Sequence, residues 1–217
     1  MSLTTGKPVY RPGVFGPHTE KALFEICAGA ILAQNTAWTN AQAAIVSLDK
    51  AASLTPEAVS RMDLETLGGL IRSSGFFRQK AGRLKLFSTY LLERHPEGLA
   101  GWFSRSGTAD LRAELLALKG IGPETADSML LYAGCKPKFV VDAYTCRIFG
   151  RLAVAGGAYA GMQAAFETAL PKEFKVYNEY HALIVALGKN YCRKTGPLCE
   201  KCPLKKMCGK KYDNRKT

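Results

Sequence analysis

The sequence predicts an all-α protein, and three observations support this fold class. Apolar residues recur three and four positions apart over most of the chain, which is the spacing of one face of a helix. Threonine, aspartate or proline stands directly before several of these runs, as is typical of helix starts. No segment of any length alternates between apolar and polar residues as a half-buried strand does, and no repeat with a period of 20 to 50 residues is present.

The first part of the chain divides into helices at these signals. Residues 1–18 contain three prolines and three glycines and predict an extended lead segment. The first helix is expected to end near Gln34, and Trp102 is expected in the core. A basic amphipathic helix follows the residues around Phe76. The expected helix starts are the caps Thr19, Thr55 and Asp63, and Trp38.

The second part of the chain begins with a helix, a tight glycine turn and a second helix over about 111–132. Gly120, Ile121 and Gly122 form the turn, and Pro123 then occupies the first helical position, where its missing N–H costs nothing. The free amides of the turn can therefore point outward together and bind a phosphate. Later helices are expected over about 144–152, 166–176 and 180–187, with a loop over 153–161.

The charge of the chain indicates a polyanionic partner. Thirty lysines and arginines against 18 acidic residues leave a net charge of +12 over 217 residues. Such an excess accelerates encounter with nucleic acid and does little for folding. No apolar run reaches membrane-spanning length and the N-terminus lacks the apolar core of a signal peptide, so no membrane partner and a cytoplasmic location are expected.

Asp142 is the candidate catalytic carboxylate. It follows three apolar residues, Phe139, Val140 and Val141, and precedes a predicted helix. A carboxylate in this position either caps the following helix or is kept partly dry for chemistry, and the two roles are compatible.

Four cysteines near the C-terminus predict a metal centre. Cys192, Cys199, Cys202 and Cys208 fall within seventeen residues. Thiolates gathered so closely need a cation, but this spacing does not separate zinc from an iron-sulfur cluster. The segment from Cys192 onward is basic, with nine lysines and arginines against two acids. The other three cysteines, expected to be buried thiols, are Cys27, Cys135 and Cys146.

These motifs together resemble the endonuclease III, or HhH-GPD, superfamily of DNA glycosylases, over nearly the whole chain. The resemblance rests on Gly120-Ile121-Gly122, on Thr125-Ala126-Asp127 and on Val141-Asp142. It implies a six-helix barrel domain over 19–136 and a helical cluster domain built from 1–18 and 137–217, with the active site in the cleft between them. It also implies that the four cysteines hold a 4Fe-4S cluster, with zinc as the alternative.

The resemblance further implies roles in DNA binding. Gln34 matches the residue that fills the gap left by an extruded base, although its residue type alone fits an ordinary polar turn. Phe76 matches an apolar wedge residue, although an aromatic there also fits a core position, the better interpretation for Phe77. The remaining DNA-binding candidates are Gly120, Gly122, Arg193 and Lys194.

One departure from the family pattern bears on the reaction. Where bifunctional members carry a Schiff-base lysine, this sequence has Glu124, which cannot form the imine. Lys119 is a poor substitute, because the resemblance places it on the phosphate-binding side. A monofunctional glycosylase is therefore expected, in which Asp142 stabilises the oxocarbenium-like state.

The lesion is expected to be an alkylated purine such as 3-methyladenine in double-stranded DNA, and the enzyme to be a monomer. An alkylated purine is cationic and leaves with little acid assistance, so an aromatic ring can select it. The resemblance places Trp38 and Glu124 at the base pocket, where Tyr144 or Phe15 is a further candidate; a helix-start surface role is the alternative for Glu124. The competing hypotheses are a glycosylase for mismatched or oxidised bases and a non-catalytic module that binds damaged DNA.

Overall fold

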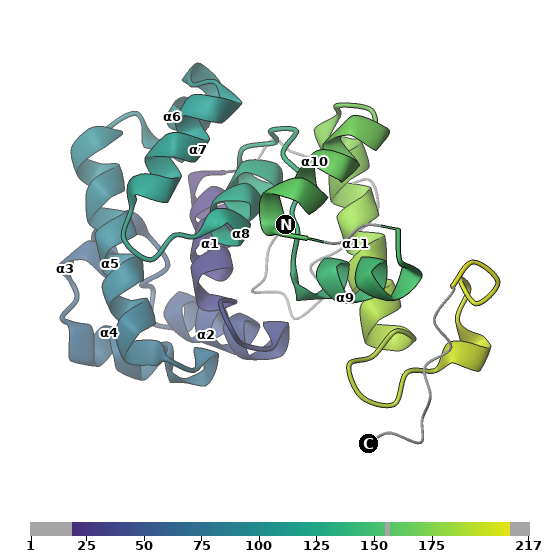
Figure 1. The fold of residues 1–217 in the computed structure, drawn as a ribbon. Coiled ribbons are helices and arrows are strands. Elements are labelled where there is room, and N and C mark those ends of the chain that lie inside the picture. The colour runs from purple at the N-terminus through teal and green to yellow at the C-terminus, as the bar shows by residue number, and fades with distance from the viewer. Residues whose placement is uncertain (1–18, 155–156, 209–217) are drawn as a thin grey trace. The chain divides into compact units, whose positions relative to one another are not determined.

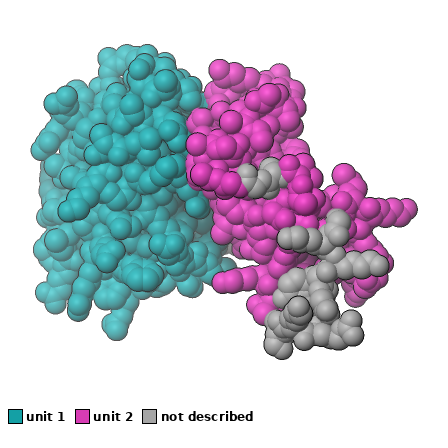
Figure 2. Space-filling model, viewed as in Figure 1, with its two compact units in different colours: residues 1–136 teal, residues 137–217 magenta. Residues whose placement is uncertain are grey.

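The protein is all-α, as predicted. The computed structural model describes residues 19–154 and 157–208, and within these ranges every regular element is a helix (Figure 1). The chain divides into two compact units, residues 1–136 and residues 137–217 (Figure 2). The expected place of residues 1–18 in the second domain, and of Phe15 near the base, lies outside the described residues.

Unit 1 contains the helices α1 to α8. The predicted caps are confirmed: the side chains of Thr19, Thr55 and Asp63 accept hydrogen bonds from the backbone N–H three residues later. The elements are α1 (Glu20–Leu32), α2 (Trp38–Lys50), α3 (Pro56–Arg61), α4 (Leu64–Leu70), η1 (Arg72–Ser74), α5 (Phe77–Arg94), α6 (Gly98–Arg105), α7 (Thr108–Ala117), α8 (Pro123–Ser128) and η2 (Met129–Ala133).

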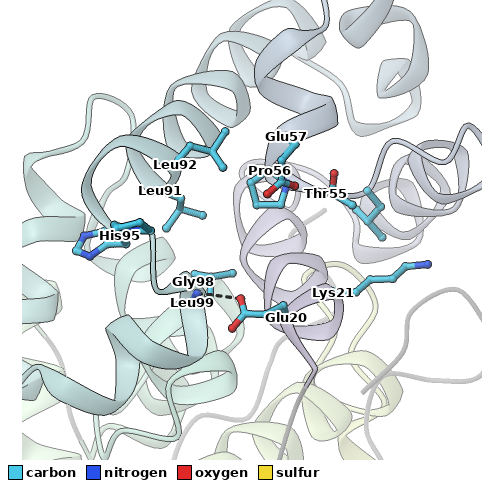
Figure 3. A pocket seen from close by; sticks show the side chains of 12 residues that line it. Glu20, Lys21, Thr55, Pro56, Glu57, Leu91, Leu92, His95, Gly98 and Leu99 are labelled. Carbon is cyan, nitrogen blue, oxygen red and sulfur yellow. Dashed lines mark hydrogen bonds between the residues drawn. The ribbon is translucent and has the colours of Figure 1, made fainter.

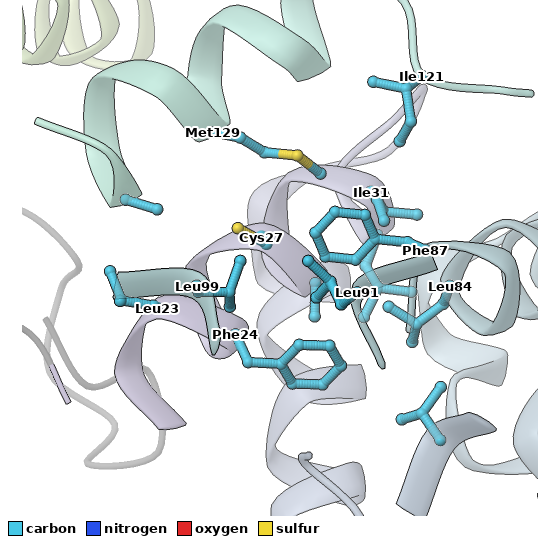
Figure 4. Close-up of a cluster of buried hydrophobic side chains, with 14 of the residues drawn as sticks. Leu23, Phe24, Cys27, Ile31, Leu84, Phe87, Leu91, Leu99, Ile121 and Met129 are labelled. Carbon is cyan, nitrogen blue, oxygen red and sulfur yellow. The ribbon is translucent and has the colours of Figure 1, made fainter. Parts of the chain in front are cut away.

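Helix α1 lies at the centre of the core of unit 1. It packs against α2, α5, α6, α8 and η2, so its side chains are buried on more than one face. Phe24 and Phe87 stack with 6.5 Å between ring centroids, beside Cys27 and Ile31 (Figure 4). Trp102 is buried in the same cluster, as predicted. This core fixes the ends of α1, α5 and α8, which carry the DNA-binding candidates of this unit.

Unit 2 contains α9 (Ala143–Leu152), α10 (Tyr159–Ala169) and α11 (Phe174–Asn190). Phe139 lies at its centre, stacked on Phe166 with 4.1 Å between centroids and in edge contact with Tyr177 at 5.6 Å. Aromatic pairs in such geometries add to the stabilisation that burial of their surface provides. The apolar run before Asp142 is therefore anchored in the core of this unit.

The cysteines outside the C-terminal loop are not all buried. Cys27 is fully buried and Cys135 is partly buried, but Cys146 is exposed, so the prediction for Cys146 is wrong. The reason is the orientation of α9, which turns Thr145 and Ile148 inward and leaves the intervening position on the outer side. Among the helices described, none is long and apolar enough to span a membrane.

Candidate active site

Asp142 caps the N-terminus of α9, as the sequence predicts. Its Oδ1 accepts hydrogen bonds from the backbone N–H of Thr145 at 2.7 Å and from the Thr145 hydroxyl at 2.9 Å. Its Oδ2 lies 3.5 Å from Nε2 of His181 on α11, and 14% of its side chain is exposed. Two elements of unit 2 therefore fix the orientation of the carboxylate.

The segment that leads to Asp142 is attached to α10 by its backbone. The N–H of Phe139 donates to Oε1 of Glu167 at 2.9 Å, and Nε2 of Gln163 donates to the Phe139 carbonyl at 2.5 Å. These bonds satisfy an extended backbone that has no neighbouring strand. Together with the Phe139 stacking they fix the approach of the chain to Asp142.

The surroundings of Asp142 favour its ionised form. Burial by itself raises the pKa of this carboxyl, but the imidazole of His181 at 3.5 Å and the two hydrogen bonds from Thr145 lower it by more. The net pKa is below the ordinary value of an aspartate. A partly buried carboxylate that stays ionised is suited to stabilise a developing positive charge.

The hairpin predicted around Gly120 lies between α7 and α8. Gly120 has φ +90°, and a β-carbon on it would lie 2.5 Å from Nε of Arg83, so glycine is required there. Nε and Nη2 of Arg112 on α7 donate to the two carboxylate oxygens of Asp127 at 2.7 and 3.2 Å. Because the Asp127 side chain is fully buried, this bidentate pair sets the spacing of the two helices.

Gln34 is bound to this hairpin by its side chain. Its Nε2 donates to the Gly120 carbonyl at 2.9 Å and to Oγ1 of Thr125 at 2.8 Å. Its Oε1 accepts from Nη1 of Arg83 at 2.5 Å. The amide thus connects the end of α1 to the glycine turn, and Gln34 must exchange these bonds for base contacts if it enters DNA. Its role in filling the gap stays a prediction.

Phe76 is exposed, whereas its neighbour Phe77 packs against the core of unit 1, as expected for Phe77. The side chain of Phe76 is 64% exposed, and its backbone has φ +46°, the left-handed region that a non-glycine residue rarely adopts. Strained backbone conformations of this kind cluster at functional sites. These features favour the wedge interpretation of Phe76 over the core interpretation.

The base-pocket candidates lie in both units. Trp38 begins α2 and packs, half-buried, against the core of unit 1, and Glu124 is exposed in the first turn of α8. Tyr144 belongs to unit 2, where it packs against Gly188 and has the Arg147 guanidinium 4.9 Å from its ring centroid. The ring of Tyr144 thus takes part in the packing of α9 on α11.

The four C-terminal cysteines are partly buried and lie in the segment after α11. Nη1 of Arg151 donates to Sγ of Cys192 at 3.3 Å, and Sγ of Cys208 lies 3.8 Å from the Arg151 carbonyl. The first and last thiols of the motif therefore approach one residue. Across 19–154 and 157–208 no three metal-ligating side chains are gathered around one point. The donor set itself, four thiols in a basic segment, has the chemistry that an iron-sulfur cluster needs.

Arg193 and Lys194 follow Cys192 directly, and both are exposed. Their backbone carbonyls accept hydrogen bonds from the Arg151 guanidinium at 2.7 and 3.2 Å. The backbone of the loop is thus held by α9 while the two cationic side chains reach solvent. This arrangement is compatible with the predicted phosphate contacts.

A separate cavity of about 240 Å³ lies elsewhere in unit 1, and none of the candidate site residues lines it. Both carboxylate oxygens of Glu20 accept backbone N–H groups there, from Leu99 and Ala100 at 2.9 Å. Figure 3 shows the bond from Leu99. The Glu20 carboxylate therefore caps the start of α6. Further residues that line the cavity are Lys21, Thr55, Pro56, Leu91 and His95.

Sequence reasoning missed several residues that support the candidate site. His181 carries no signal beyond its place on an apolar helical face, where a histidine is usually a core residue. Arg83 on α5 and Arg112 on α7 likewise carry no signal in the sequence that points to their partners, Gln34 and Asp127. Their partners lie at distant positions in the chain, so no local pattern could have identified them.

Comparisons with known proteins agree with this geometry. Residues 28–172 match the family described as the HhH-GPD superfamily base excision DNA repair protein. A protein of Methanocaldococcus jannaschii named as a DNA repair glycosylase is 43% identical over 187 residues, 85% of this chain and 84% of that protein. Endonuclease III of Thermotoga maritima is 30% identical over 192 residues, 88% of this chain and 84% of its own length.

Solved structures show the same fold. The H. pylori 3-methyladenine DNA glycosylase bound to 1,N6-ethenoadenine has a TM-score of 0.65 at 25% identity, over 79% of this chain and 89% of that one. A non-covalent endonuclease III–DNA complex has a TM-score of 0.70 at 23% identity, over 88% of this chain and 86% of that one. The family match over residues 28–172 and the two relatives, together with the helical hairpin and the capping Asp142, show that the chain belongs to the HhH-GPD superfamily and is a base excision repair DNA glycosylase.

Proposed function

We propose that the protein is a monofunctional glycosylase that removes alkylated purines such as 3-methyladenine from double-stranded DNA. The observation that carries this proposal is Glu124, in the first turn of α8, at the position where bifunctional members have the lysine that forms a Schiff base. The likeness to the H. pylori 3-methyladenine DNA glycosylase supports the choice of lesion. The enzyme is proposed to act as a monomer.

In this proposal Asp142 stabilises the reaction. Cleavage of the N-glycosidic bond builds positive charge on the deoxyribose, and an ionised carboxylate at that face lowers the barrier. The same carboxylate can accept a proton from the attacking water. The bonds from Thr145 and the nearby His181 keep Asp142 ionised and oriented for both tasks.

Trp38 and Glu124 are assigned to the base. An indole ring attracts a cationic purine through the electron density of its face, and a carboxylate adds Coulomb attraction. Tyr144 is a weaker candidate, since its ring already packs between Gly188 and the Arg147 guanidinium. Gln34, Phe76, Gly120 and Gly122 are assigned to the DNA, together with Arg193 and Lys194.

A panel of duplexes tests the choice of lesion. The wild-type protein is expected to release 3-methyladenine and 7-methylguanine, but no thymine or adenine from mismatches and no oxidised pyrimidine. Trp38→Ala should slow release of the methylated purines by about tenfold, whereas Trp38→Phe keeps a ring and should lose much less. Release of an oxidised or mismatched base at a comparable rate would contradict the proposal.

Borohydride treatment tests the monofunctional assignment. A Schiff base between enzyme and deoxyribose is reduced to a stable covalent complex, which is visible on a denaturing gel. Wild-type protein on a lesion duplex is expected to give no such complex, while a bifunctional endonuclease III should give one in a parallel reaction. A trapped complex with the wild type would identify a lysine nucleophile and refute the assignment.

The proposed 4Fe-4S cluster would be held by Cys192, Cys199, Cys202 and Cys208. Such a cluster supplies four metal–thiolate bonds that tie a loop together, and the surrounding lysines and arginines offset its negative charge. Its proposed role is to fix the loop that carries Arg193 and Lys194. Arg151 supports this loop from α9 through its bonds to Cys192, Arg193 and Lys194.

Absorbance and metal analysis check the cluster. Anaerobically purified protein is expected to be brown, with absorbance at roughly 400 nm and four irons per chain. Cys202→Ser should lose the colour and most of the iron, whereas Cys146→Ser, at an exposed cysteine outside the motif, should keep both. A content of one zinc and no iron per chain would show that the four cysteines bind zinc and not an iron-sulfur cluster.

The lowered pKa of Asp142 predicts a broad acidic range of activity. The group stays ionised as pH falls below the ordinary aspartate value, so single-turnover rates should stay nearly constant from about pH 7 down to about pH 4. The same shift stabilises the fold above that ordinary value, and this stability is lost as pH falls through the lowered pKa. Thr145→Val removes one donor to Oδ1 and should move the acidic limb upward, which a pH–rate profile measures. An unchanged limb would contradict this account.

A further inference from the structure

Lys80 is a buried lysine that the proposed mechanism does not use. It belongs to α5, and only 1% of the residue is exposed. Its Nζ donates to the Leu32 carbonyl at 2.8 Å and to the Ser74 carbonyl at 2.6 Å. Both acceptors are backbone groups from distant parts of unit 1, so this ammonium connects two chain segments.

These two segments carry the two side chains proposed to enter the duplex. Leu32 is the last residue of α1, two residues before Gln34. Ser74 is the last residue of η1, two residues before Phe76. The final carbonyls of a helix have no partner within the helix, and Lys80 supplies one for each of these two ends.

A second contact joins the same region. The hydroxyl of Ser73 in η1 donates to the Asn40 carbonyl in α2 at 3.1 Å, so the turn before Phe76 is also bound to the helix that follows Gln34. The Ser74 hydroxyl donates to the Ile71 carbonyl at 2.7 Å, which closes the turn on itself. The spacing of the two turns is therefore set by hydrogen bonds as well as by apolar packing.

The position of Lys80 is unfavourable for a charge. Burial, with a further contribution from the positive charge of Arg83, lowers the pKa of Lys80 to about 8. Placing an ammonium there costs free energy that an apolar side chain of the same length would not cost. The benefit that offsets this cost is geometric, because an apolar side chain cannot hold two carbonyls at once.

We propose that Lys80 is a positioning residue that fixes the Gln34 turn and the Phe76 turn relative to one another, so that both side chains enter the duplex in one event. This inference rests on the proposed DNA-binding roles of Gln34 and Phe76. It assigns to Lys80 no contact with DNA or with the excised base. Its effect should be limited to steps that require opening of a duplex.

The test compares Lys80→Met with Lys85→Met. Lys85 lies on the same helix and its Nζ also donates to a backbone carbonyl, that of Met62 at 2.5 Å, but this carbonyl belongs to the turn between α3 and α4. The control thus removes the same kind of bond from a place that carries no probing side chain. Circular dichroism first establishes that each variant is folded. Lys80→Leu, which also removes the ammonium and leaves a smaller apolar side chain, replaces Lys80→Met if that variant does not fold.

The first readout is independent of base excision. A duplex with a tetrahydrofuran abasic analogue carries 2-aminopurine beside it, and insertion of the probing residues unstacks this base and raises its fluorescence. Wild type and Lys85→Met should give the same increase in fluorescence. Lys80→Met should bind the duplex with nearly the wild-type affinity but give only a small increase in fluorescence. A full rise with Lys80→Met would overturn the proposal.

The second readout separates positioning from a general loss of structure. Single-turnover release of 3-methyladenine is measured from a duplex and from the same strand alone. Lys80→Met should slow release from the duplex by about tenfold or more and change release from the single strand by less than about twofold. Equal losses on both substrates would assign Lys80 a merely structural role. If the wild type releases no methylated purine, the proposed function fails, but the fluorescence test still decides the role of Lys80.

Discussion

Replacing Asp142 with asparagine is expected to lower the single-turnover rate of base release by about 10³-fold while changing the duplex dissociation constant by less than about threefold. Asparagine has nearly the same shape, and its side-chain oxygen can still accept the Thr145 N–H at the start of α9. The substitution therefore removes the negative charge and leaves the cap. Rapid-quench measurements on a methylated duplex and a binding titration on an abasic-analogue duplex give the two quantities.

The matched control for this variant is Asp63→Asn. Asp63 caps α4 in the same way, accepting the Thr66 N–H at 2.8 Å, but it has no assigned role in the reaction. Its variant should release bases at the wild-type rate. If Asp142→Asn stays within about tenfold of the wild type, the carboxylate does not stabilise the transition state. If the wild type binds damaged duplexes but releases no base from any of them, a non-catalytic binding module would be the better description.

Removal of Arg112 is expected to destabilise unit 1 by about 3 to 5 kcal/mol, because the buried carboxylate of Asp127 then loses its charged partner. The pair is bidentate, and the Asp127 side chain is fully buried. Arg112→Met keeps an apolar stem of similar length and removes the guanidinium. Urea unfolding followed by circular dichroism gives the change in the free energy of unfolding, and a loss of the hairpin spacing should weaken duplex binding in parallel.

Two further variants test whether the loss of stability in Arg112→Met comes from the burial of the Asp127 carboxylate. Lys21→Met breaks the surface pair with Asp49, in which 58% and 27% of the side chains are exposed, and should change the free energy of unfolding by about 1 kcal/mol or less. Arg112→Met combined with Asp127→Leu removes both charges and should recover much of the loss. If Arg112→Met alone is as stable as the wild type, water or another group must satisfy the carboxylate of Asp127.

The structural role of a residue could be predicted from the sequence wherever its hydrogen-bond partner lies within one helical turn. The side chains of the caps Thr19, Asp63 and Asp142 accept a hydrogen bond from the backbone N–H three residues later. Four consecutive residues are therefore enough to predict each cap. Pro123 begins α8 after the Gly120 turn for the same local reason. The helical periods, these caps and the absence of strand-like alternation together determined the all-α fold.

The burial of individual residues was harder to predict than the helices and their caps. Cys146 and Thr145 are adjacent and equally compatible with a helix, yet one faces solvent and the other is buried, because the neighbouring helix covers only one side of α9. Phe76 and Phe77 show the same contrast at the start of α5. A helical pattern gives the period of burial, but its phase depends on which neighbour packs where.

The tertiary structure alone decided which distant groups meet. His181 lies 39 positions after Asp142 in the sequence, Gln34 bonds to Gly120 across 86 positions, and Lys80 reaches back 48 positions to Leu32. Such contacts depend on the angles and positions at which helices pack against one another, and these could not be predicted from the residue types along the chain. The amino-acid sequence by itself determined the helices, the hairpin motif and the carboxylate; folding decided which side chains orient that carboxylate and hold the probing turns, because hydrogen-bond geometry is set between helices and not along them.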